Sequence, residues 1–159
     1  MSLLEIAKNH GEDGIVELKG RVWKDPDSSW WLIEISFLDV MTQGKTRKEA
    51  LEMIKDAVLE LLKDSYENLL DKHFQVTVRL YEDGVIGMGA SDDKLLFALG
   101  LKRQRLRSGS TIRDVSKRLK SKSPNAYARY ERAQARPSLE KYAELLHAAN
   151  PHRRPLLVS

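Results

Sequence analysis

Residues 111–138 constrain the fold more than any other stretch, because they predict two short helices joined by a turn and followed by a basic loop. Thr111 can cap the first helix, with Asp114 three residues later as a weaker form of the capping box. The polar run Lys120-Ser121-Lys122 then ends that helix as a turn. Ser123-Pro124 starts the second helix, since Ser provides an N-cap oxygen and Pro suits the first helical position, which needs no N–H partner.

The spacing of apolar residues indicates which helix faces turn inwards. Val115 and Leu119 are four apart on the first helix, and Tyr127 and Tyr130 are three apart on the second, so the two pairs can pack together. Core packing is favoured for both tyrosines over stacking on bases. The residues left facing outwards are small, polar or basic: Ser123, Asn125, Ala128, Arg129 and Arg132. Such a face on a second helix suits the major groove of DNA.

We expect the two kinds of DNA contact to come from different parts of this stretch. Base reading is assigned to Ser123, Asn125, Ala128 and Arg129, since Asn can bond bidentately to adenine and Arg to guanine. The phosphate contacts are assigned to residues at the edges: Thr111, Arg113, Lys117, Lys122, Arg132 and Arg136. The alternative for Arg129 is an ion pair with an acidic neighbour and no contact with a base.

The charges divide the chain into two unlike halves. Residues 1–93 carry 11 Lys and Arg against 19 Asp and Glu, a net charge of −8. Residues 94–159 carry 16 against 4, a net charge of +12. This asymmetry predicts two domains with two different partners, of which the basic one binds a polyanion. The alternative is a lopsided but merely solvated surface.

Several classes of site are excluded by composition. The chain has no Cys, and its four His are scattered without ligand spacing, so we expect no disulfide, metal site or cofactor. The N-terminus lacks a signal-peptide pattern, and no run of about 18 apolar residues is present. These observations predict a cytoplasmic protein with no membrane partner.

The first half predicts an α+β fold, a small antiparallel sheet with one long helix across one face, in the order β-β-β-α-β. Alternating apolar residues predict strands at residues 15–23, 30–37, 40–43 and 74–81, the first two joined as a hairpin. Thr46 and Glu49 form a capping box at the start of the helix. The helix is expected to end at Lys63 or to continue through Leu70, and residues 85–88 could add another strand.

The second half predicts an all-α domain. Ser91 can cap a helix that buries Leu95, Leu96, Leu99 and Leu106, and Gly109 ends it. A last helix begins after Ser138. We therefore divide the chain into residues 1–88, a hinge at 89–93, residues 94–150 and a tail at 151–159. Residues 1–13 could form a short helix or a disordered start.

Residues 94–150 resemble a helix-turn-helix domain of the Cro/repressor type. The resemblance rests on residues 111–119, on Tyr127-Ala128-Arg129-Tyr130-Glu131-Arg132 and on Pro137-Ser138-Leu139-Glu140, in that spacing. Two features depart from the family. Its turn usually holds Gly and an apolar residue, where this chain has a Lys120-Ser121-Lys122 turn one residue longer, and Ile112 stands where a phosphate-binding Gln is common.

Residues 15–81 resemble the HicB antitoxin domain. The resemblance rests on Trp30-Trp31 and on Thr42-Gln43-Gly44, Thr46, Glu49-Ala50-Leu51, Ile54 and Ala57. A Leu-Pro-Gly turn that is usual in the family is replaced by residues 37–41. The resemblance implies a trimmed ribonuclease-H-like fold that binds and blocks a small basic mRNA-cleaving toxin, HicA, while a fused DNA-binding domain represses the shared operon.

Together the two resemblances predict an antitoxin and transcriptional autorepressor of a type II toxin-antitoxin pair. Its partners would be operator DNA, a HicA-like toxin and further copies of itself, as a dimer or a higher even oligomer. Contacts with the toxin are assigned to Asp25, Asp27, Trp30, Glu34 and Asp39, which lie near strand ends and loops.

Two other functions remain open. One is a stand-alone transcriptional regulator whose first domain dimerises or senses a ligand. The other is a nucleic-acid-processing enzyme, which would need several carboxylates converging on Mg²⁺. Glu17 is the only acidic residue of the first strand and is flanked on its face by Lys19 and Arg21, so we expect no enzyme.

Overall fold

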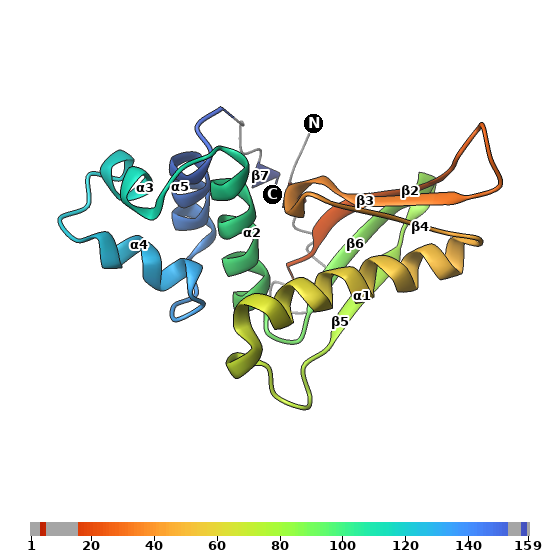
Figure 1. Cartoon of the computed structure of the whole chain (residues 1–159), viewed down its shortest axis with the longest axis horizontal. Helices are drawn as coiled ribbons and strands as arrows, with labels where there is room; N and C mark the ends of the chain where they lie inside the picture. Colours follow the sequence, from red (N-terminus) through yellow and green to blue (C-terminus); the bar gives the residue numbers. More distant parts are fainter. Residues whose placement is uncertain (1–3, 6–15, 153–156, 159) are drawn as a thin grey trace.

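The computed structural model describes residues 4–5, 16–152 and 157–158 and shows an α+β fold, a five-stranded antiparallel sheet followed by a group of helices (Figure 1). The sheet has the order β4-β3-β2-β6-β5. Its strands are β2 (Leu18–Lys24), β3 (Trp31–Ile35), β4 (Val40–Gly44), β5 (Val76–Leu80) and β6 (Val85–Ala90). Two short strands near the termini, β1 (Leu4–Glu5) and β7 (Leu157–Val158), pair in parallel.

The helices are α1 (Arg47–Tyr66), α2 (Asp93–Arg107), α3 (Ile112–Arg118), α4 (Pro124–Glu131) and α5 (Leu139–Ala149). α1 lies across one face of the sheet (Figure 1). Its N-cap is Thr46, whose Oγ1 accepts a hydrogen bond from the Glu49 amide at 3.0 Å, as the sequence predicts. Its apolar stripe is fully buried: Ala50, Ile54, Val58 and Leu62. Burial of this stripe against the sheet is the main stabilisation of the first half.

Most predicted strands of the first half are confirmed. β2 and β3 form the expected hairpin, and residues 85–88 belong to β6, which lies between β2 and β5. The second strand ends at Ile35, earlier than predicted, because a 3-10 turn (Ser36–Leu38) follows and Asp39 takes a left-handed conformation with φ 56°. Ile15, residues 1–3 and 6–13, and most of the tail lie outside the described residues.

Two details of the first half differ from the prediction. α1 ends at Tyr66, between the two endpoints considered, and is followed by a 3-10 turn (Glu67–Leu69). A further 3-10 turn (Glu82–Gly84) joins β5 to β6. The alternation of apolar residues in the 74–81 strand predicts that Leu80 points inwards with Val76 and Val78. Leu80 is instead 38% exposed, because it ends β5, an edge strand with a neighbour on one side only.

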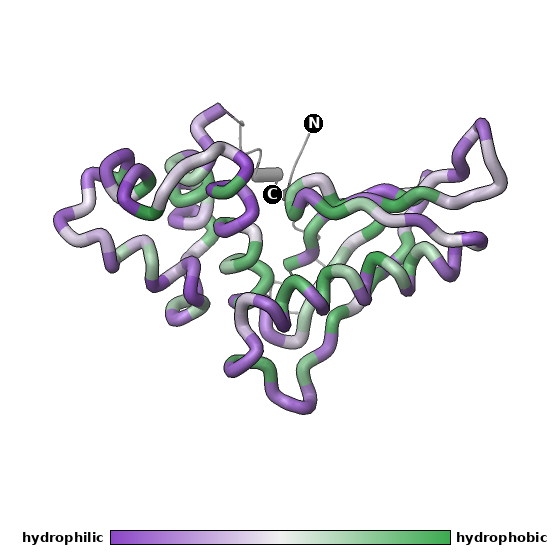
Figure 2. Tube along the Cα trace, in the orientation of Figure 1, coloured by the Kyte–Doolittle hydropathy of each residue, from purple (hydrophilic) through white to green (hydrophobic). Residues whose placement is uncertain are grey.

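α2 lies between the sheet and the remaining helices and contacts both (Figure 1). Residues 95–101 are buried on every side of the helix, and hydrophobic residues gather there (Figure 2). At its C-terminal end the buried position belongs to Gln104, whose Nε2 donates to the Phe37 carbonyl at 2.7 Å. The prediction that Leu106 is buried is therefore wrong, since Leu106 is 52% exposed.

The predicted hinge at residues 89–93 falls where β6 passes into α2. Gly89 and Ala90 belong to β6, and Asp93 begins α2, so that only Ser91 and Asp92 connect the two elements. The N-cap of α2 is Asp92, whose carboxylate accepts from the Lys94 amide at 3.2 Å. Ser91, predicted as the cap, instead accepts a hydrogen bond from the Gln75 amide. The division into two domains stays a prediction, and one continuous cluster of buried side chains spans both halves.

Gly100 allows the close approach of the two halves, and its replacement gives a first test. A β-carbon at this position would overlap the Phe37 ring and the Tyr142 hydroxyl. We expect Gly100→Ala to lower the free energy of unfolding by about 1–3 kcal/mol through overpacking. The fall should be seen although Ala favours a helix by about 1 kcal/mol. Urea unfolding followed by circular dichroism measures the change. An unchanged or higher midpoint would show that Phe37 and Tyr142 move aside for the methyl group at little cost.

Candidate nucleic-acid interface

The start of α3 is held by the predicted capping box. Thr111 Oγ1 accepts from the Asp114 amide at 3.1 Å, and the Asp114 carboxylate accepts from the Thr111 amide at 2.8 Å. These hydrogen bonds to Thr111 lower the pKa of Asp114. Val115 is fully buried and Leu119 is partly buried against the core, as the apolar spacing predicts. The cap therefore fixes where α3 begins and which face it buries.

The turn after α3 is closed by backbone hydrogen bonds. Lys120 adopts φ 54°, a left-handed conformation that glycine usually occupies at the end of a helix. Its amide donates to the Lys117 carbonyl at 3.0 Å, and the Ser121 amide donates to the Ser116 carbonyl at 3.1 Å. This pair of bonds is the Schellman motif. Lys120 thus takes over the geometric role of the missing glycine.

α4 begins as predicted and presents a polar outer face. The Ser123 hydroxyl accepts from the Asn125 amide at 3.2 Å, and Pro124 occupies the first turn. Tyr127 is buried and Tyr130 is partly buried, so both pack inwards as expected. Ser123, Asn125, Arg129 and Arg132 are exposed.

Ala128 corrects the predicted base-reading set. It is only 2% exposed, because α4 packs against both α2 and α3 and buries this side of the helix. Its methyl group therefore cannot reach a base in this arrangement, and the exposed candidates are Ser123, Asn125 and Arg129.

Most of the predicted phosphate contacts are available. Thr111, Arg113, Lys117, Lys122 and Arg132 are all exposed. Within the described residues, none of these four cations, nor Arg129, makes an ion pair. Arg136 is different, because its guanidinium holds both carboxylate oxygens of Asp93 at 2.9 and 3.0 Å and lies 5.3 Å from the centroid of the Phe97 ring. Arg136 is already neutralised there, so its assignment to phosphate is not supported.

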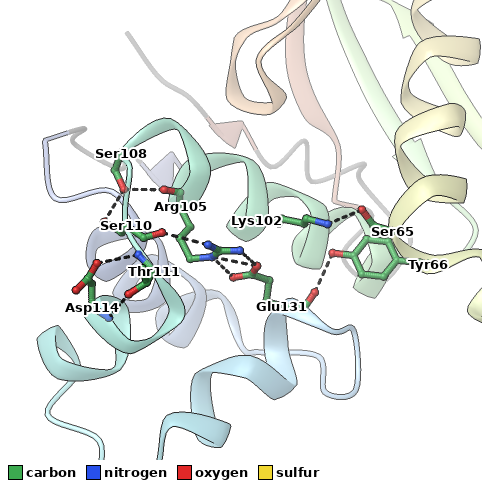
Figure 3. A network of polar contacts seen from close by, with 9 residues as sticks. All are labelled: Ser65, Tyr66, Lys102, Arg105, Ser108, Ser110, Thr111, Asp114 and Glu131. Carbon is green, nitrogen blue, oxygen red and sulfur yellow. Dashed lines mark hydrogen bonds and ion pairs between the residues drawn. The ribbon is translucent and has the colours of Figure 1, made fainter.

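A buried ion pair links the end of α4 to α2 (Figure 3). The Arg105 guanidinium donates to both Glu131 carboxylate oxygens at 2.6–3.1 Å and to the Ser110 carbonyl at 3.1 Å. The side chains are 13% and 6% exposed. The hydrogen bond to Glu131 raises the pKa of Arg105. Sequence spacing gave no signal for this pair, since its members are 26 residues apart.

The same network ties the first half to the helices. The Tyr66 hydroxyl at the end of α1 donates to the Glu131 carbonyl at 2.8 Å, and the Lys102 ammonium donates to the Ser65 hydroxyl at 2.9 Å (Figure 3). Arg103 donates to the Leu38 carbonyl at 2.8 Å. These bonds hold the exposed face of α4 in a fixed position relative to the sheet.

The buried tyrosines predict how stability depends on alkaline pH. Burial raises the pKa of Tyr66, Tyr127 and Tyr142, since an ionised phenol would lose its hydration. In the unfolded chain tyrosine ionises near about pH 10. The unfolded state therefore releases these protons first, so this contribution to stability is complete below about pH 10 and is lost as the pH rises further.

We expect these three of the five tyrosines to ionise only as the protein unfolds. The ultraviolet absorbance of tyrosinate and the circular dichroism should change together for them, and in denaturant all five should titrate in one step. Full ionisation of a still folded protein would contradict the burial of these hydroxyls.

The residues assigned to a protein partner are spread along the first half. Asp25, Asp27 and Trp30 lie in the β2–β3 turn, where Asp25 accepts from the Ser28 hydroxyl at 2.7 Å, a bond that lowers its pKa. Glu34 is partly buried in β3. Asp39, at the other end of β3, already lies 3.5 Å from Arg107 of α2. The structure therefore does not gather these five residues into one cluster.

The comparison with protein families agrees with this geometry. Residues 101–150 match the helix-turn-helix family, and this segment is a helix-turn-helix domain of the Cro/C1 type. This is a fold of DNA-binding transcription regulators. No curated protein and no solved structure matches the chain.

Two further findings concern other kinds of site. Among the described residues, no group of three or more His, Asp or Glu side chains is arranged to hold a metal ion. None of the described helices combines the length and the apolar composition that crossing a membrane requires.

Proposed function

We propose that this chain is a sequence-specific DNA-binding repressor that places α4 in the major groove. The exposed Asn125 and Arg129 on that helix carry the proposal, since neither side chain makes a hydrogen bond or ion pair with a described residue. Ser123 lies at the start of α4, the end that reads bases in helix-turn-helix proteins. Arg113, Lys117, Lys122 and Arg132 would neutralise phosphates on either side, each steepening the salt dependence of log K by about 0.9.

We further propose that the chain is a cytoplasmic antitoxin of the HicB type, which blocks a small basic mRNA-cleaving toxin and represses its own operon. The net charge of −8 in residues 1–93 supports a basic protein partner, since opposite charge speeds encounter and fixes orientation. This proposal includes a trimmed ribonuclease-H-like fold for the first half of the chain. It also includes a dimer or a higher even oligomer. An edge strand of the sheet, β4 or β5, could form the contact between copies through its backbone groups.

Co-expression tests the antitoxin role. The full chain is produced together with the small basic protein encoded next to it, and both growth and co-purification are measured. The proposal expects the neighbour alone to arrest growth, and the pair to grow normally and purify as one complex. If the chain neither rescues growth nor co-purifies with the neighbour, the antitoxin role is wrong, while DNA binding remains separately testable.

A second candidate is a stand-alone regulator whose first half senses a small ligand. A cavity beside the buried Glu17 carboxylate favours it. The stand-alone regulator would bind DNA and would have no toxin partner. We propose no enzymatic activity, and Mg²⁺-dependent cleavage of RNA or DNA by the purified chain would contradict that.

A further inference from the structure

Glu17 is a buried carboxylate that neither the DNA interface nor the antitoxin role uses. It precedes β2 and is only 3% exposed. The Tyr81 hydroxyl donates to its Oε1 at 2.7 Å, and Arg79 Nε lies 4.0 Å from the same oxygen. Burial and the bond to Glu17 raise the pKa of Tyr81, which keeps its hydroxyl a donor.

The second oxygen of this carboxylate is in a different situation. Oε2 is buried and has no hydrogen-bond partner among the described residues. A buried anionic oxygen without a hydrogen-bond donor is strongly disfavoured. We therefore expect this oxygen to accept a hydrogen bond from a bound molecule.

The strands around Glu17 leave room for this oxygen. A β-carbon at Gly87 of β6 would overlap Oε2, so glycine at this position lets the carboxylate lie against the strand. Glycine inside a strand often marks such a close approach. Because Leu18 and Met88 point into the core on the α1 side, their neighbours Glu17 and Gly87 belong to the opposite face of the sheet.

A cavity of about 450 Å³ adjoins the carboxylate, where β2 and β6 lie side by side (Figure 1). It is lined by Glu17, Lys19, Tyr81, Val85 and Gly87, with Glu82 adding a second carboxylate. Its volume falls within the roughly 300–1,000 Å³ range of small-molecule sites.

We propose that this cavity binds a small organic cation, whose amino or amidinium group donates to Glu17 Oε2 after a small rotation of the carboxylate, while its apolar part lies against Tyr81 and Val85. A cation supplies both the donor and the charge that a buried carboxylate needs. The site goes beyond the proposed DNA-binding and antitoxin functions, and it gives the second candidate, the ligand-sensing regulator, the class of its ligand. Binding of the cation is measured without DNA, so its failure is distinguishable from a failure of DNA binding.

Benzamidine is the probe, with benzoate as an anion of the same size and benzamide as its neutral counterpart. Binding to the full chain is followed by nuclear magnetic resonance titration. Benzamidine should bind tighter than benzamide by roughly 10- to 100-fold, since a charge-assisted hydrogen bond is lost in the neutral compound. Benzoate should not bind. The shifts should concentrate at Tyr81, Val85 and Gly87.

Glu17→Gln should weaken the binding of benzamidine by a similar roughly 10- to 100-fold factor. Glu60→Gln, which removes an exposed carboxylate on α1, should leave it unchanged. Equal binding of all three compounds, shifts elsewhere on the protein, or unchanged affinity in Glu17→Gln would each overturn the site. A cavity that holds only water gives no saturable shift and overturns it too. The wild-type titration keeps the test valid if the variant fails to fold.

Discussion

Arg105→Ala should lower the free energy of unfolding by about 3–5 kcal/mol, because it leaves a buried carboxylate without its partner. Glu131 is 6% exposed, and its carboxylate accepts three hydrogen bonds from Arg105. Arg105 also donates to the Ser110 carbonyl, which precedes the cap of α3. Its removal therefore weakens the attachment of both α3 and α4 to α2.

Urea unfolding of the purified variants measures this loss. Arg107→Ala is the matched control, since Arg107 lies on the same helix but is 47% exposed and 3.5 Å from an exposed aspartate. That surface pair should contribute less than about 1 kcal/mol. The double variant Arg105→Met with Glu131→Met should recover much of the loss, because no buried charge remains. Equal effects of the two single Arg variants would contradict the account of the buried pair.

Arg129→Ala should weaken specific DNA binding by roughly 10- to 100-fold, since a bidentate contact between Arg and guanine contributes about 1–3 kcal/mol of discrimination. Arg129 is exposed on α4 and makes no ion pair with a described residue. Binding to random duplex DNA should change much less, because a base-reading side chain adds little to affinity without its base. Both affinities must be measured at one salt concentration.

Lys48→Ala is the control for the loss of one positive charge. Lys48 is exposed in the first turn of α1, at the end of the molecule away from α4 (Figure 1). The Lys48→Ala variant should bind specific and random duplex DNA with nearly unchanged affinities. If Arg129→Ala weakens specific and random DNA equally, Arg129 contacts phosphate, and base reading moves to Asn125 and Ser123.

The local signals in the sequence predicted much of the framework. The caps at Thr46, Thr111 and Ser123 lie where predicted, because a capping residue acts on amides two or three positions away. The stripes of α1 and α3 and the β2–β3 hairpin are likewise set by near neighbours. The fold class and the helix-turn-helix domain could therefore be inferred before the structure.

The features that the sequence did not reveal depend on packing between distant segments. Ala128 has a small side chain on a polar helix, and nothing nearby in sequence shows that α2 and α3 both cover it. Arg136 was assigned to phosphate because it lies in a basic loop, yet Asp93, 43 residues earlier, holds it. The Arg105–Glu131 pair and the orphaned oxygen of Glu17 likewise depend on contacts between segments far apart in the chain.

Selection from a pool of random duplexes tests whether the α3–α4 unit reads DNA sequence. The full chain is incubated with the pool at physiological salt, and bound duplexes are amplified and sequenced over several rounds. We expect enrichment of one motif, bound about 10³-fold or more tighter than random DNA. The double variant Arg129→Ala with Asn125→Ala should lose that enrichment. A pool that stays random while the protein remains folded would contradict the claim.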